Sequence, residues 1–397
     1  MKSSGVGGQA VLEGVMMRNK EKYAVAVRKP DQKIAIKVDE YHSIGERIPI
    51  FKLPILRGVV AFVESLVVGM KTLMYSAEFV EEDTKEKETS SGNAKNQTIA
   101  SIFMVVISIF LAVAIFMMLP YFISQLLNRV IPSQTILAMM EGVLRIAIFV
   151  GYVAVVSKSK DIKRVFMYHG AEHKTINCLE NGLELTIENV RKQPKYHRRC
   201  GTSFLLIVMV VSVILFMFIR VSSPVLRMIL RLLLIPVISG ISYELIKAAG
   251  NMEDSITEIK KSSDSKGIQF LKILRFLFLS LFSRPGKWMQ SLTTKEPEDS
   301  MIEVAIASVS AVFDWKAYLA ELKTKQKDQK TNKIVRLQTK AKSSNETISE
   351  SAVTKENSED LQEEEEDKDE VLDALDKFFV YKEEPKKEDK KKGKIRF

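Results

Sequence analysis

Long stretches without a charged residue constrain this chain more than any other feature of its sequence. Residues 96–128 contain no Asp, Glu, Lys or Arg. That run exceeds the roughly 20 apolar residues that an α-helix needs to cross the hydrocarbon core of a bilayer. We therefore predict a first membrane-spanning helix over 99–119, ending at Pro120.

Three further apolar segments, 136–156, 201–219 and 224–246, complete a prediction of about four spans. The first of these carries Glu141 and Arg145, which are one helical turn apart and can pair inside the membrane. The last carries arginines near one end, where long side chains can reach the interface. The predicted fold class is mainly α, a polytopic helical membrane protein.

The distribution of basic residues predicts the orientation. Ten of them lie in 157–200, whereas 120–135 contains only Arg129 and 220–223 only Arg220. Because Lys and Arg concentrate in cytosolic loops, we expect 157–200 and both termini to lie on the cytosolic side of the cell membrane. Cysteines on that side stay reduced, which favours a thiol or a metal ligand over a disulfide.

Residues 1–97 are expected to form a cytosolic segment with a small β-hairpin and an amphipathic helix. Alternating segments at 23–28 and 33–38 predict the hairpin. The glycine-rich stretch 5–8 is interpreted as a tight turn against another backbone. A helix over 54–79 carries one charge every seventh residue, and this narrow polar stripe favours packing among the spans over a position in the membrane interface.

The rest of the chain is expected to fall into five parts. These are spans one and two within 98–156, a cytosolic loop at 157–200, spans three and four within 201–247, interfacial and cytosolic helices within 248–324, and a disordered charged tail at 325–397. The tail lacks apolar periodicity and is the predicted contact for a protein partner. The net charge of +10 does not indicate nucleic-acid binding. The excess of Lys and Arg over Asp and Glu lies upstream of the tail, and contact with anionic membrane lipid explains it.

The scarce metal-binding side chains are concentrated in two short clusters. The chain has only 4 His and 2 Cys, and four of these six are His169, His173, His197 and Cys200. His169 and His173 are spaced i,i+4, which places both imidazoles on one helix face. We predict that the four residues bind a divalent metal, with zinc the best match to nitrogen and sulfur donors.

The number of ligands decides between two roles for such a site. If all four residues coordinate, the site is closed and structural. If three coordinate, a water can take the open position, and Glu172 becomes the candidate general base. The order His-x-x-Glu-His is that of inverzincin metallohydrolases, whose remaining acidic ligand is not identifiable here. Glu180, Glu184 and Glu244 are equal candidates for it, and Cys178 is interpreted as a packed thiol.

Four sequence blocks together resemble a known family. They are Gly7-Gly8-Gln9-Ala10-Val11-Leu12-Glu13-Gly14-Val15-Met16-Met17-Arg18, Tyr168-His169-Gly170-Ala171-Glu172-His173-Lys174, His197-Arg198-Arg199-Cys200-Gly201-Thr202-Ser203-Phe204 and Leu292-Thr293-Thr294-Lys295-Glu296-Pro297. Over roughly residues 5–315 the chain resembles the YqhQ-like family of bacterial membrane proteins, a domain of unknown function labelled as a predicted metal-dependent enzyme. The resemblance implies a multi-pass membrane protein and a metal-dependent activity.

Two functions follow from these observations. The first is a metal-dependent hydrolase at the membrane surface, with Arg198 and Arg199 available to an anionic substrate. The second is a non-catalytic membrane assembly factor, stabilised by a metal, that engages a translocon, a ribosome or another membrane complex. A third function, transport past Glu141 and Arg145, has no internal repeat to support it.

Overall fold

The computed structural model describes residues 4–85, 103–104, 106–108, 110–131, 133–197, 200–219, 221, 223–250 and 266–324. The chain divides into two units, of which the first comprises Met1–Gly250 and Phe282–Thr339. This first unit contains the sheet, all four histidines and both cysteines. The predicted disordered tail, 325–397, lies outside the described residues.

The N-terminal segment forms a four-stranded antiparallel sheet in the order β1-β2-β3-β4. Its strands are β1 (Val6–Val11), β2 (Gly14–Asn19), β3 (Lys22–Arg28) and β4 (Ile34–Glu40). The hairpin of β3 and β4 confirms the predicted one. The predicted tight turn at 5–8 is wrong, because residues 6–8 extend as the first part of β1 and pair with β2.

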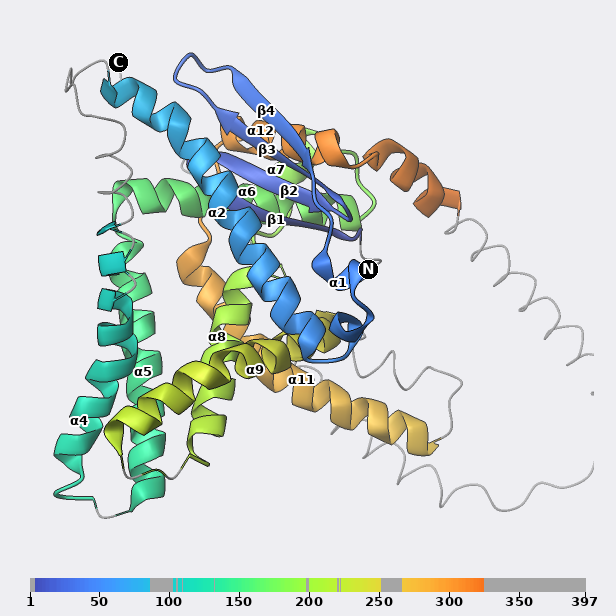
Figure 1. Ribbon diagram of the computed structural model, residues 1–397. Coiled ribbons are helices and arrows are strands. Elements are labelled where there is room, and N and C mark those ends of the chain that lie inside the picture. The colour runs from blue at the N-terminus through green and yellow to red at the C-terminus, as the bar shows by residue number, and fades with distance from the viewer. Residues whose placement is uncertain are drawn as a thin grey trace, which may run out of the picture. The chain divides into compact units, whose positions relative to one another are not determined.

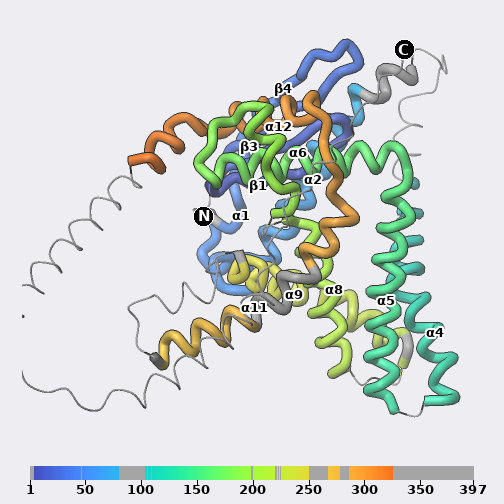
Figure 2. The backbone as a smooth tube through the Cα atoms, turned by 180° about the vertical axis from the view of Figure 1, so that it is seen from behind, coloured from blue at the N-terminus to red at the C-terminus, as the bar shows by residue number. Residues whose placement is uncertain are grey.

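Helices cover both faces of this sheet (Figures 1 and 2). On one face, side chains such as Val15, Met17 and Ala26 join a core with α6 (Lys160–Glu180) and α12 (Asp299–Val312). On the other face, Met16 and Val25 pack with Val68 of α2 (Leu56–Lys85). Successive residues of a strand point to opposite faces, so β2 and β3 are buried on both sides.

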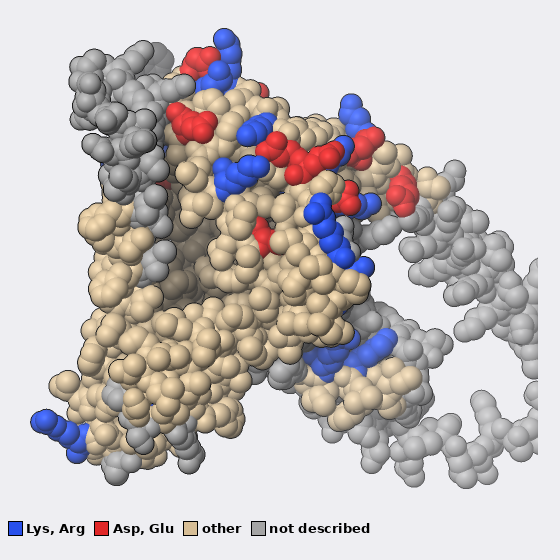
Figure 3. Space-filling view, in the orientation of Figure 1, with Lys and Arg blue, Asp and Glu red and all other residues tan. Residues whose placement is uncertain are grey.

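The described helices include four that are long and apolar enough to cross a membrane. They are Leu56–Phe79 of α2, Val106–Leu127, Gln134–Val156 and Val225–Ala249. The corresponding labels in Figure 1 after α2 are α4 (Leu119–Leu127), α5 (Gln134–Val156) and α9 (Pro224–Gly250). In Figure 3 the charged side chains gather over the sheet, and the surface formed by α4, α5 and α9 is almost free of them. These features indicate a multi-pass membrane protein.

Two predicted span boundaries need correction. The first span does not end at Pro120, because a π-helical stretch, Ala114–Met118, precedes α4 and Pro120 lies in the first turn of α4. The candidate span Val106–Leu127 therefore runs through Pro120, and membrane helices tolerate such a proline where local adjustments such as π-helical turns satisfy the freed backbone groups. The third predicted span is α8 (Gly201–Phe216), an apolar helix shorter than the other four.

The helix predicted over 54–79 is α2, and it packs against both the membrane helices and the sheet. The Phe62 ring lies 5.6 Å from that of Phe204 in α8. The remaining short elements are α1 (Ile44–Arg47), a 3₁₀ turn (Pro49–Lys52), α7 (Ile187–Arg191) and a final helix at 315–324. The helix α11 (Lys266–Thr293) begins in the second unit and ends in the first.

Candidate metal centre

The second half of α6 supplies two adjacent histidines from a buried helix. Every residue from Gly170 to Glu180 is buried, because α6 packs against the sheet and α12. The ring centroids of His169 and His173 are 4.4 Å apart, as the i,i+4 spacing predicts. His173 is only 1% exposed, so its imidazole depends on the protein for hydrogen-bond partners.

Backbone carbonyls fix the protonation of both rings. The Nδ1 atom of His169 lies 2.8 Å from the Thr293 carbonyl oxygen, and that of His173 lies 2.6 Å from the Lys195 carbonyl oxygen. A carbonyl can only accept, so each Nδ1 donates and carries the proton. In the neutral rings both Nε2 atoms therefore keep a free lone pair, the state in which histidine binds metals.

One of these lone pairs has no protein partner. Within the described residues, the Nε2 atom of His173 is buried and makes no hydrogen bond. An unsatisfied buried acceptor is costly, and a metal ion at this position would satisfy it.

Cys200 supplies the third donor from the start of α8. Its sulfur lies 3.3 Å from the Nε2 atom of His169 and accepts the N–H of Thr202, so Cys200 is the N-cap of α8. Burial acts to raise the pKa of the Cys200 thiol, but His173 and His169 outweigh it and hold that pKa well below its usual value. The thiolate is the form of cysteine that binds metals.

The three donors converge on one point. The ligand atoms of His169, His173 and Cys200 all lie within 4.8 Å of one another, and no other group of this composition occurs among the described residues. Two imidazoles and a thiolate match the ligands of zinc. The donor set therefore fits a bound divalent metal.

Glu172 borders this group of donors. Its Oε2 atom lies 3.8 Å from the Nε2 atom of His169 and 3.9 Å from that of His173. The glutamate is only 4% exposed, and Gly8 of β1 lies against its side chain. A Cβ atom placed on Gly8 would be 2.7 Å from the Glu172 Cγ atom, so only glycine fits at that position of β1.

His197 lies near the donors but makes a different contact. Its ring centroid is 5.8 Å from that of His173, and its Nε2 atom faces the Glu180 carboxylate at 3.4 Å. The structure brings three of the four predicted ligands together and leaves His197 outside the group. Arg198 and Arg199, predicted to contact a substrate, lie outside the described residues.

Two of the three other acidic candidates have partners of their own, and the third, Glu184, is exposed. Glu180 accepts the backbone N–H and the hydroxyl of Ser4, and Glu244 pairs with Arg57. Cys178 is fully buried, and burial raises the pKa of its thiol to about 11, as expected for a packed cysteine.

The sequence prediction missed the residues that hold the histidines in place. The carbonyls that accept hydrogen bonds from the two histidines belong to Thr293 and Lys195. The Lys295 backbone also packs on α6, because a Cβ atom placed on Gly170 would lie 2.0 Å from the Lys295 carbonyl oxygen. Residues 293 and 295 belong to Leu292–Pro297, one of the four blocks that carry the family resemblance. Membership of that block was the signal in the sequence that these residues matter. The carbonyl contacts themselves depend on tertiary structure.

A family model described as "Protein of unknown function (DUF1385)" matches residues 53–263 and 266–315. The chain belongs to the DUF1385 family. Its matched range contains His169, Glu172, His173, Cys200 and the Thr293 carbonyl, whereas β1 precedes it.

A curated relative extends this DUF1385 assignment. The chain is 35% identical over 313 residues to "Uncharacterized protein YqhQ" of Bacillus subtilis (strain 168), which covers 77% of the chain and 92% of that relative. The resemblance inferred from the four sequence blocks is thereby confirmed. No solved structure matches this DUF1385 protein.

Proposed function

We propose that this DUF1385 protein is a membrane-bound, metal-dependent hydrolase whose active site faces the cytosolic surface of the membrane. The observation that carries the proposal is the convergence of His169, His173 and Cys200 beside the Glu172 carboxylate. Three protein donors next to a carboxylate is the composition of a catalytic zinc site, which keeps one position open.

Each residue then has a defined role. His169 and His173 would bind the metal through Nε2 while their Nδ1–H groups stay on backbone carbonyls, which orients both rings. Cys200 would bind as the thiolate. Zinc, the best match to these donors, would supply Lewis acidity towards water and the substrate oxygen.

Glu172 provides the proton transfer that hydrolysis requires. A carboxylate beside the open position can accept a proton from the attacking water and later donate it to the leaving group. The position of His197 supports this role, because the ring faces Glu180, and a histidine as fourth ligand would close the site. The reaction class is hydrolysis of an ester, an amide or a phosphoester.

The test is a substitution that keeps the metal ligands and removes the base. Glu172→Gln should retain the bound metal and lose cellular function, assayed by complementation of a deletion strain. Glu188→Gln is the matched control, since Glu188 lies on the exposed surface of α7 and pairs only with basic neighbours there. Wild-type function in a metal-loaded Glu172→Gln protein would contradict the hydrolase.

The burial of the site favours a second function, a non-catalytic assembly factor with a structural metal. His173, Glu172 and Cys200 are 1%, 4% and 4% exposed, which is typical of a closed site. Glu172 would then act as the fourth ligand, and Glu172→Gln would lose both metal and thermal stability. Crosslinking in cells should recover a stoichiometric protein partner if this second function is correct, and none if it is wrong.

A further inference from the structure

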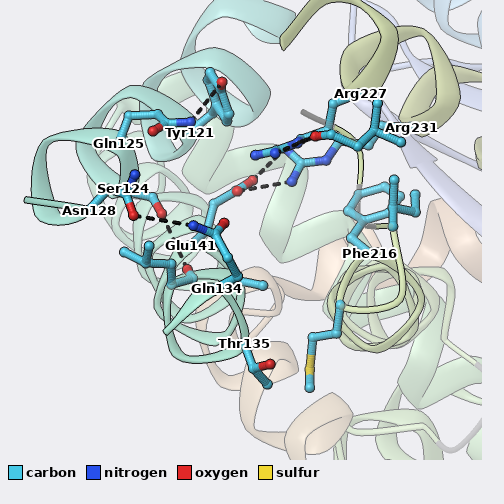
Figure 4. Close-up of a pocket in the computed structure, with 15 residues that line it drawn as sticks. Tyr121, Ser124, Gln125, Asn128, Gln134, Thr135, Glu141, Phe216, Arg227 and Arg231 are labelled. Atoms are coloured by element: carbon cyan, nitrogen blue, oxygen red, sulfur yellow. Dashed lines mark hydrogen bonds and ion pairs between the residues drawn. The ribbon is translucent and has the colours of Figure 1, made fainter. Parts of the chain in front are cut away.

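A polar cavity lies among the apolar helices, separate from the metal centre (Figure 4). It has a volume of about 410 Å³ and is bounded by α4, α5, the end of α8 and the start of α9. Hydroxyl and amide groups line one side, among them Ser124, Gln125, Asn128 and Gln134. Charged side chains within membrane helices, such as Glu141 and Arg231 in this lining, are costly and mark functional sites.

The charges at the cavity do not balance. Glu141 accepts hydrogen bonds from Arg145 at 2.8 Å and from Arg231 at 2.5 and 2.9 Å. All three side chains are less than a tenth exposed. Two guanidinium groups against one carboxylate leave one positive charge without a counter-charge, and burying such a charge is unfavourable.

Arg227 adds a further positive charge to the lining. Its guanidinium donates to the Val221 carbonyl oxygen at 2.5 and 3.1 Å, and no carboxylate among the described residues pairs with it. It also lies over the Tyr121 ring, 5.6 Å from the centroid. Three arginines and one glutamate therefore give this region a net charge of +2.

One donor in this region has no partner. The Nε atom of Arg231 is buried and makes no hydrogen bond within the described residues, and the side chain is 8% exposed. In Figure 4, Arg227 and Arg231 lie side by side across the cavity from Gln125 and Asn128. An anion with several oxygens would meet guanidinium donors on one side and amide donors on the other.

We propose that this cavity binds a phosphate group, and that the ligand is the headgroup of an anionic phospholipid. The planar guanidinium fork matches phosphate oxygens, and the bound anion would offset the excess positive charge. Apolar lining residues such as Leu137, Phe216 and Ile219 suit the glycerol and acyl part of a lipid. Free phosphate shares the headgroup chemistry and is distinguished by the test.

The test compares lipid and phosphate binding to the full-length protein in detergent. Native mass spectrometry would follow titration with dioleoyl phosphatidylglycerol and, separately, dioleoyl phosphatidylcholine. Equilibrium dialysis with labelled inorganic phosphate would report the free anion. The affinity for phosphatidylglycerol should exceed that for phosphatidylcholine about tenfold or more. This ratio corresponds to the free energy of one charge-assisted hydrogen bond.

Arg227→Gln is the informative variant, because Arg227 donates only to one backbone carbonyl. It should lower phosphatidylglycerol affinity about tenfold, whereas Arg227→Lys should keep the preference for the anionic lipid. Arg129→Gln is the matched control, since Arg129 is exposed in the connection between α4 and α5 and does not line the cavity.

The outcomes separate the two ligand sources. Loss of phosphatidylglycerol binding in Arg227→Gln alone supports the lipid headgroup. Phosphate binding that depends on Arg227, without a lipid preference, supports the phosphate site with a free anion as its ligand. Equal effects of Arg227→Gln and Arg129→Gln, or no Arg227-dependent binding of either probe, would overturn the proposal.

Discussion

In the neutral rings of His169 and His173 the proton lies on Nδ1, because both Nδ1 atoms face backbone carbonyls. The donors for a metal are thus set by groups far away in the sequence, at residues 293 and 195. Neutral imidazole and thiolate are the binding forms, so metal binding is linked to the protons that these side chains hold without metal.

Zinc binding at pH 7 should release a proton. Burial acts to lower the pKa of His169, but the Cys200 thiolate outweighs it and raises that pKa to about 9. Without metal, His169 is therefore charged at pH 7, and coordination requires its neutral form. Calorimetric titration in buffers of different ionisation enthalpy measures this release, which should fade as the pH rises above about 9. No proton release at pH 7 would contradict the imidazolium–thiolate pair.

Gly8→Ala should displace Glu172 without removing the metal ligands. The added Cβ atom would lie 2.7 Å from the Glu172 Cγ atom and 2.9 Å from the Met16 carbonyl oxygen. Overpacking of this kind costs about 1–3 kcal/mol. We expect lower thermal stability and loss of function with the metal retained. Gly7→Ala is the control, because nothing lies within 4 Å of its added Cβ atom, and equal effects of both changes would refute the contact.

At the scale of elements, the polar stripe of α2 connects three parts of the fold. Arg57 pairs with Glu244 of α9, and Lys71 lies 3.6 Å from Asp39 of β4. Between them, Glu64 accepts hydrogen bonds from the Ser43 hydroxyl and the Ile44 N–H at the start of α1. The seven-residue spacing of these charges thus fixes α2 against separate elements.

Glu64→Ala should destabilise the protein by about 1–3 kcal/mol, because it leaves the Ile44 N–H without its acceptor. Glu64 is only 7% exposed, so water cannot readily replace the carboxylate. Thermal unfolding in detergent measures the change. Glu78→Ala, on the exposed end of the same stripe, should change stability by less than about 0.5 kcal/mol. Similar losses in the two variants would show that the Glu64 contacts do not stabilise the fold.

Some elements were predictable from the sequence and others were not, for physical reasons. β3 and β4 were predicted because the exposed side of β4 preserves the alternation of polar and apolar residues. β2 was missed because it is buried on both faces, so Gly14–Met17 has no polar alternation. The i,i+4 pair of α6 is local and was predicted, whereas Gly8 over Glu172 results from a tertiary contact.

For the whole molecule, the orientation of the spans decides which side of the membrane the candidate metal centre faces. The excess of basic residues in 157–200 favours the cytosolic side, and the sheet packs on α6, which places both on the same side. Val130, between α4 and α5, is 79% exposed and should face the opposite side.

Labelling with a membrane-impermeant maleimide tests this orientation. Val130→Cys should react in intact cells, and Lys192→Cys, at the exposed end of α7, should react only after lysis. The two native cysteines are buried and should give little background. The reverse labelling pattern would place the metal centre outside the cytosol.

Metal content is the most direct measurement of the proposed centre. Elemental analysis of the purified protein should find about one zinc ion per chain in the wild type and almost none in His173→Ala. His42→Ala is the control, because His42 is exposed and lies outside the group of converging donors, and it should keep the metal. A wild type without metal, or equal metal content in His173→Ala and the wild type, would contradict the metal centre.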